Sequence, residues 1–197
     1  MTGRTDTRER ILDIAEQLLA TRGYQGFSYH DIAAPLGVKN AAIHYHFPTK
    51  ADLGVAIIKR YRNLLKDSTA EFMGYGGSAR RQLEGYVQFF MQEALENQTM
   101  CPMGVLTSDY FSIPDSMREE GTLLEQEVFT WLMKVLEVGR DQGELCFEGD
   151  AKTRALIIMS TLQGARQLAR MMGSEVLSTA LQVLREELYN EAATAAA

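Results

Sequence analysis

Apolar residues recur at every third or fourth position along almost the whole chain, and this spacing constrains the fold more than any other feature. It matches the turn of an α-helix, in which such residues share one face. No alternating strand pattern is longer than the fragment 145–147. The first segment shows the helical pattern in Ile11, Ile14, Ala15, Leu18 and Leu19. The sequence therefore predicts an all-α protein of about nine helices.

Turn and capping residues indicate where these helices begin and end. In the first part of the chain, the signals are Gly23, Ser28, Gly37 and Thr49. The second helix is expected to run to about Leu36, although Pro35 in its last turn removes a hydrogen bond and could end it early. Later helices are expected to begin near Pro102, Pro114, Asp150 and Ser174.

Charge is distributed unevenly along the chain. Residues 1–66 carry ten lysines and arginines against six aspartates and glutamates, whereas the rest carries ten against twenty. With the glycine-rich run at 74–77, this predicts a domain over 1–48, a connecting helix over 49–76 and a domain over 77–197. The positive balance at the N-terminal end indicates that only the first domain faces a polyanion.

Cysteine usage and hydropathy bear on location and cofactors. Cys101 and Cys146 form no disulfide framework, and their spacing fits no zinc pattern. Charged residues interrupt every long apolar stretch, so no transmembrane or signal segment is expected. We therefore expect a cytoplasmic protein with reduced thiols, without a metal, a cofactor or a membrane partner.

The segment GVKNAAIHYHFPTK, residues 37–50, concentrates side chains that carry chemistry. Metal binding is disfavoured because His44 and His46, two apart on a helix, are separated by about 200° around its axis. Catalysis is disfavoured because the segment holds no nucleophile, zinc-protease or phosphate-binding motif. A solvated helical corner stays open as an alternative. DNA contact is favoured, because a short helix, a glycine turn and a second short helix have the dimensions of a helix-turn-helix motif.

In such a motif, the start of the second helix reaches base edges in the major groove. Lysine can bind guanine, asparagine can bind adenine, and an alanine methyl can pack on thymine, while later donors suit phosphate oxygens. The residues expected to contact DNA are Ser28, Tyr29, Lys39, Asn40, Ala42, His44, Tyr45 and Lys50. Ile43, Phe47 and Phe27 are expected in the core instead.

The stretch TRERILDIAEQLLATRGYQGFSYHDIAAPLGVKNAAIHYHFPTKADL resembles the N-terminal domain of the TetR/AcrR family of transcriptional regulators. Four features coincide in order: the A-x-x-L-x-x-x-x-G-Y/F helix end, D-I-A, L-G-V, and Y-H-F-x-x-K before a leucine. The resemblance implies a three-helix helix-turn-helix domain and a C-terminal helical bundle that binds an effector and dimerises through its last two helices. Ala42 stands where members of the family often carry Thr or Ser, so one polar contact is expected to be missing.

The C-terminal part carries aromatic residues that could surround an effector. Each of them is also a candidate core residue, since an apolar pocket and a core use the same side chains. No charged residue stands out as a counter-ion, which favours an apolar or neutral effector. The residues expected to bind the effector are Tyr86, Phe90, Tyr110 and Trp131.

Cys101 is expected to be a second sensing residue. It directly precedes Pro102, and proline favours the first position of a helix. The thiol would then lie at the N-cap, where the helix dipole favours the thiolate. The segment resembles a subgroup of the family in which a cysteine at this place senses oxidants or electrophiles. A small buried thiol without a sensing role is the alternative.

The last two expected helices, over about 151–172 and 175–190, are the expected dimer interface. Their apolar surface is wider than one stripe, and small residues on the first of them would permit close approach of a partner helix. The expected interface residues are Ile158, Leu162, Gly164, Ala165, Leu181 and Leu184. A core formed within one chain explains the same residues.

These features predict a homodimeric regulator of transcription rather than an enzyme. We expect a repressor that binds a palindromic operator and is released by an apolar or electrophilic effector or by modification of Cys101. The alternative is an all-helical carrier or enzyme that has lost DNA binding. The basic N-terminal domain disfavours this alternative, because a carrier has no use for it.

Overall fold

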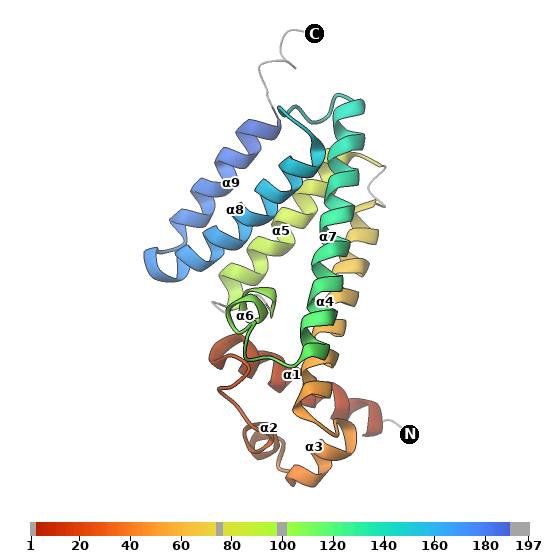
Figure 1. Cartoon of the computed structure of the whole chain (residues 1–197), viewed down its shortest axis with the longest axis vertical. Coiled ribbons are helices and arrows are strands. Elements are labelled where there is room, and N and C mark those ends of the chain that lie inside the picture. Colours follow the sequence, from red (N-terminus) through yellow and green to blue (C-terminus); the bar gives the residue numbers. More distant parts are fainter. Residues whose placement is uncertain (1–2, 74–76, 98–101, 190–197) are drawn as a thin grey trace. The chain divides into compact units, whose positions relative to one another are not determined.

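A computed structural model describes the backbone of residues 3–73, 77–97 and 102–189, and their side chains except for 3–6, 71–73 and 92–97. These ranges contain nine α-helices and no strand, which confirms the all-α prediction (Figure 1). The helices are α1 (Gly3–Arg22), α2 (Tyr29–Leu36), α3 (Asn40–His46), α4 (Lys50–Met73), α5 (Ala79–Asn97), α6 (Pro102–Ser108), α7 (Asp115–Asp141), α8 (Ala151–Met172) and α9 (Glu175–Leu188).

Three helices begin at the capping residues that the sequence indicated. Ser28 donates its N–H and its hydroxyl to the Asp31 carboxylate, at 2.8 and 2.7 Å. Thr49 makes the same pair of bonds to Asp52, at 2.9 and 2.7 Å. Asp150 accepts an N–H from the first turn of α8 at 2.8 Å. These bonds satisfy backbone donors that a helix start otherwise leaves open.

The end of α2 lies where the sequence predicts it. The helix includes Pro35 and continues to Leu36, so Pro35 does not end it early. Pro35 removes a single hydrogen bond, the one to the Asp31 carbonyl. Gly37 then adopts a φ of 67°, and its N–H donates to the Ala34 carbonyl at 3.2 Å. The left-handed glycine, rather than the proline, ends the helix.

The chain folds into two units whose membership does not follow the sequence order. The first unit comprises residues 1–64 and 99–124, and the second comprises 65–98 and 125–197. α4 and α7 each run from one unit into the other. The expected boundaries near residues 48 and 76 did not anticipate that 99–124 would belong with the N-terminal helices.

Side-chain contacts explain why the start of α7 belongs to the first unit. Glu120 of α7 is buried between Lys59 and Arg62 of α4, with N–O distances of 3.7 and 2.8 Å. Gly54 of α4 packs so closely on α7 that a Cβ there would lie 2.3 Å from the sulfur of Met117. These contacts hold the first halves of α4 and α7 together.

The second unit is a bundle formed by α5, α8, α9 and the second half of α7. Leu83, Leu132 and Ile158 are among the residues buried at its centre. On its surface, Arg185 of α9 donates to both carboxylate oxygens of Glu84 of α5, at 2.7 to 3.2 Å. The amphipathic faces predicted for these helices therefore meet in one core.

Two kinds of feature are missing from the residues that the structure describes. No helix there is long and apolar enough to cross a membrane. Charged side chains recur along every long helix, which accounts for this finding. In the same ranges, no three histidine, cysteine, aspartate or glutamate side chains gather where they could hold a metal ion.

Candidate nucleic-acid interface and effector region

The first unit contains the expected helix-turn-helix. α2 and α3 pack against each other and are joined by three residues, of which Gly37 is left-handed. The N–H of Val38 donates to the Ala33 carbonyl at 3.2 Å, which closes the turn on the end of α2. Lys39 then takes the extended conformation of an N-cap, with φ −83° and ψ 152°. Backbone bonds therefore set the direction in which α3 leaves the turn.

α3 has one buried and one exposed face. Ile43 and Phe47 are buried, at 0% and 3% exposure, which confirms their expected core positions. Lys39 and Asn40 at the start of α3 are exposed, and Tyr45 is 66% exposed. The exposed face therefore carries a cation, an amide and a phenol, all able to donate hydrogen bonds.

Tyr29 does not lie on the exposed face. It is 8% exposed, and its hydroxyl donates to the Phe47 carbonyl at 2.7 Å. Its ring meets the His44 ring edge-on, with 4.6 Å between centroids. Burial, with a further contribution from Asp52, raises the pKa of Tyr29 to about 12. The structure thus contradicts the expected DNA contact of Tyr29, because the hydroxyl is turned into the domain.

Lys50 also points inward. Its ammonium donates to the carbonyls of Tyr24 and Phe27 and lies 4.6 and 4.3 Å from the centroids of the same two rings. Burial lowers the pKa of Lys50, although Asp31 opposes this effect. These two carbonyls use two of the three N–H donors of the ammonium, so the expected phosphate contact of Lys50 stays a prediction. Its role is to join α4 to the α1–α2 loop.

Other expected contact residues are exposed or partly exposed. Ser28 is exposed, but its hydroxyl donates to Asp31 within the cap of α2. His44 is exposed, with Nδ1 3.1 Å from the Pro48 carbonyl. If Nδ1 carries the proton of that bond, Nε2 is the nitrogen left to meet DNA. Ala42 is partly buried on the same helix.

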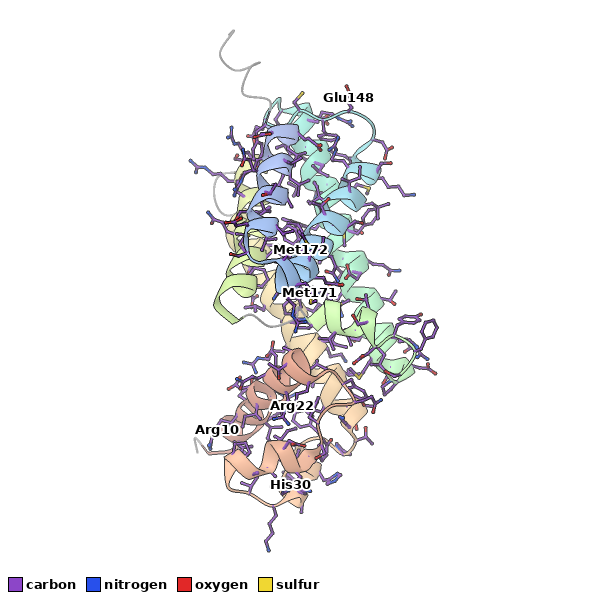
Figure 2. All side chains as sticks on the ribbon, turned by 90° about the vertical axis from the view of Figure 1, so that its left-hand side faces the viewer. Arg10, Arg22, His30, Glu148, Met171 and Met172 are labelled. Carbon is purple, nitrogen blue, oxygen red and sulfur yellow. The ribbon has the colours of Figure 1, made fainter. Side chains whose placement is uncertain are left out.

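His30 is a candidate that the sequence analysis missed. Tyr29, Ile32 and Ala33 are buried, which is an i, i+3, i+4 stripe facing the core. The intervening His30 is therefore exposed on the first turn of α2 (Figure 2). The apolar residues Ile32 and Ala33 mark the buried face of α2, and from their positions the sequence could have shown that His30 lies on the exposed face. His30 replaces Tyr29 among the candidate DNA contacts.

Three of the expected effector residues come together in the second unit. The Tyr86 ring lies 5.3 Å from Trp131 and 6.3 Å from Phe90, between ring centroids. The indole N–H of Trp131 is buried, and no described residue accepts a hydrogen bond from it. Arg166, a buried cation that the sequence analysis did not single out, lies with its guanidinium carbon 5.2 Å from the centre of the Phe90 ring. An N–H donor and a cation therefore border this aromatic group.

The remaining two expected effector residues are Tyr110 and Cys101. Tyr110 belongs to the first unit and is 49% exposed, with its ring against Phe111 and Arg118. Cys101 lies outside the described residues. α6 does begin at Pro102, as expected.

Most of the expected dimer residues are buried within the chain's own bundle. Those from α8 and α9 that are 0–6% exposed are Ile158, Leu162, Ala165, Leu181 and Leu184. All five belong to the core of the second unit, which fits the alternative of a core formed within one chain. Gly164 is the exposed member of the expected set, and beyond its own helix no atom of the described residues lies within 4 Å of where its Cβ would be.

Known proteins share both the DNA-binding segment and the fold. The family model described as "Bacterial regulatory proteins, tetR family" matches residues 11–57. The crystal structure of a TetR-family transcriptional regulator from Agrobacterium tumefaciens is 30% identical and superposes with a TM-score of 0.88 over 94% of this chain and 98% of that one. The chain belongs to the TetR family of transcriptional regulators.

Two further relatives support the assignment to the TetR family. A TetR transcriptional regulator from Legionella pneumophila is 32% identical, with a TM-score of 0.79 over 91% of this chain and 94% of that chain. The HTH-type transcriptional repressor NemR of Escherichia coli strain K12 is 26% identical over 89% of this chain and 90% of its own. As a TetR-family regulator the protein is not an enzyme, which sets aside the enzyme alternative.

Replacing Tyr29 by Phe tests its inward role. The variant loses the hydrogen bond to the Phe47 carbonyl, and its free energy of unfolding should be about 1 kcal/mol lower than that of the wild type. In the wild type, the raised pKa means that the stabilisation is present below pH 10 and is lost as the pH rises through about 12. Denaturant titrations at pH 8 to 12 should therefore show the two proteins converging at high pH.

Tyr110→Phe is the matched control, because it removes the same hydroxyl from an exposed position. It should leave the unfolding free energy unchanged. A Tyr29→Phe variant as stable as the wild type but weaker in DNA binding would show that Tyr29 faces DNA.

Proposed function

We propose that this TetR-family regulator is a repressor that binds a palindromic operator as a homodimer and is released by a small effector. The exposed start of α3 carries this proposal, because Lys39 and Asn40 stand where a recognition helix meets base edges. The positive balance of residues 1–66 supports it. The similar protein NemR is named as a repressor.

Each exposed residue has a role that fits its chemistry. Lys39 would bind guanine and Asn40 would bind adenine, while the Ala42 methyl would pack on thymine. Donors farther along the surface would hold phosphates, because phosphate contacts orient a protein without selecting sequence. We assign that role to His30, His44 and Tyr45. Tyr29 acts within the domain instead, while Lys50 bonds the α1–α2 loop and keeps a third N–H for a phosphate.

Alanine variants of Lys39 and Asn40 test the assignment to base contacts. Each should weaken binding to DNA selected from a random pool by about 1–3 kcal/mol and relax preference at one or two base pairs. Fluorescence anisotropy at several salt concentrations would measure both the affinity and its salt dependence.

Lys134→Ala is the matched control, since Lys134 is an exposed lysine of the second unit. It removes the same charge and should leave base preference unchanged. The assignment fails if Lys39→Ala behaves like Lys134→Ala.

The exposed side of α8 and α9 is the surface we propose for the dimer. The large apolar residues exposed there are Leu156, Ile157, Leu168, Met171, Met172 and Val183. Figure 2 shows Met171 and Met172. Ile157, Gly164, Leu168 and Met171 follow helical spacing and so form one stripe. An exposed apolar stripe of this kind needs a covering partner. A second copy would present the same stripe by two-fold symmetry.

Leu168→Glu should convert the dimer into a monomer, because two charges would meet at the symmetric contact. Sedimentation velocity would show the change in mass, and affinity for a complete palindrome should fall more than affinity for a half-site. Leu123→Glu, which alters an exposed leucine of the first unit, should do neither. A dimer of unchanged stability in Leu168→Glu would contradict this interface.

The group of Tyr86, Phe90 and Trp131 is the effector site we propose. A ligand bound there would meet aromatic rings and could accept a hydrogen bond from the buried Trp131 N–H. The nearby Arg166 favours a ligand with negative charge over one with positive charge. We therefore propose an aromatic or apolar effector with an acceptor group, a change from the neutral effector expected from sequence. Modification of Cys101 is a second proposed input.

Trp131 is the single tryptophan, so its emission reports directly on this site. Salicylate, which offers a carboxylate, should change that emission and free the DNA at lower concentration than toluene, which offers no acceptor. Trp131→Phe, followed by DNA release alone, should reduce this preference. Cys101→Ser should keep the salicylate response but lose release by a quinone. Equal release by a quinone from both proteins would remove Cys101 from the proposal.

A further inference from the structure

Asp109, which lies outside the three DNA-binding helices, accepts a hydrogen bond from the loop between α1 and α2. Asp109 follows α6, and its carboxylate accepts the backbone N–H of Tyr24 at 2.9 Å. Gln25, next in the chain, donates through its side chain to the Ser112 carbonyl at 3.0 Å. The α1–α2 loop is therefore bonded twice to the corner between α6 and α7, although the two segments lie 85 residues apart at Tyr24 and Asp109.

The corner itself sets the position of Asp109. The Asp109 N–H donates to the Val105 carbonyl at 2.8 Å, and its C=O accepts the N–H groups of Ser112 and Ile113 at 2.7 and 3.1 Å. Arg118 of α7 donates to the Ile113 carbonyl at 2.9 Å. The backbone of Asp109 is therefore held within the α6–α7 corner, and its carboxylate projects from this held position to the Tyr24 N–H.

Gly23 shows how closely the corner and the loop approach. Its φ is +73°, and a Cβ at this position would lie 3.1 Å from the Asp109 carboxylate. Both the conformation and the spacing favour glycine here. Asp109 therefore contacts the backbone at the residues where α1 ends, Gly23 and Tyr24.

Lys50 holds the other polar group of the same backbone residue. While Asp109 accepts the Tyr24 N–H, the Lys50 ammonium donates to the Tyr24 carbonyl. Tyr24 is buried, so both groups depend on these partners. Because one partner of each bond is charged, both bonds belong to the stronger class. Lys50 begins α4 shortly after the end of α3, so the position of Tyr24 bears on how α3 is presented.

We propose that Asp109 and Lys50 are positioning residues for DNA recognition, through which the α6–α7 corner sets the orientation of α3 by way of Tyr24. The proposal rests on the DNA-binding function proposed above. Both residues act on α3 through the backbone of Tyr24, which lies in the same unit as they do.

The test compares selected and random DNA in the full-length Asp109→Ala variant. DNA is first selected from a random pool with the wild-type protein, and both affinities are measured by fluorescence anisotropy. Loss of the carboxylate should lower the ratio of selected to random affinity about tenfold, the usual scale for a lost charged hydrogen bond. Asp109→Asn retains an acceptor oxygen and should recover most of that ratio.

Glu119→Ala is the matched control, because Glu119 is an exposed carboxylate of the same unit. Removal of its charge should slightly raise affinity for all DNA and leave the ratio unchanged. Because both residues act through Tyr24, their effects should not add. The double variant Asp109→Ala/Lys50→Met should therefore have a ratio of selected to random affinity no lower than that of whichever single variant has the lower ratio. Losses that multiply, or a wild-type ratio in Asp109→Ala, would overturn the proposal.

Amide hydrogen exchange provides a measurement that needs no DNA. Exchange over residues 24–28 and in α3 should accelerate in Asp109→Ala and not in Glu119→Ala. If the wild-type protein selects no sequence, the proposed DNA-binding function fails, and exchange still decides whether Asp109 holds the loop. Unchanged exchange in Asp109→Ala would overturn the positioning role by itself.

Discussion

The DNA-binding domain is organised around one ammonium group. Lys50 places its charge between two backbone carbonyls and two aromatic rings of the α1–α2 loop. Burial makes the charged form costly, which is why the pKa of Lys50 is lowered. The carbonyls and ring faces offset that cost by replacing water. As a result, the loop after α1 and the first turn of α4 form one piece, and the short helices α2 and α3 are held between them.

The inward direction of Lys50 and Tyr29 also shapes the DNA-facing surface. A domain of three helices has a small core, so polar groups at its edge add bonds that apolar contacts alone do not supply. Tyr29 ties the start of α2 to the end of α3 through the Phe47 carbonyl. The side chains left on the outside of α3 are then few, and Lys39 and Asn40 at its start are the most suited to bases.

Sequence reasoning succeeded where the signal is local. Ser28, Thr49 and Asp150 cap helices as expected, because a cap and the N–H that it binds lie within three residues of each other. It failed where the role of a side chain depends on which distant part of the chain packs against it. Tyr29 looked like a donor for DNA, yet its hydroxyl bonds to another part of the same domain.

α8 shows the same limit. Its sequence has apolar residues on two sides, and composition does not distinguish the side that fills the chain's own core from the side left exposed. The structure places Leu162 in the core and Leu168 on the surface. Arg166 escaped notice for a similar reason, since a charged residue in a helix is usually solvated.

The sequence by itself determined the helical class, most helix ends, the helix-turn-helix and the family, because each depends on periodicity or on residues close together in the chain. Only the tertiary structure decided that residues 99–124 join the N-terminal helices. It also decided that Asp109 and Lys50 meet at Tyr24. The physical reason is that such bonds join segments far apart in sequence, and no local preference specifies which distant group will arrive to satisfy a buried N–H or carbonyl.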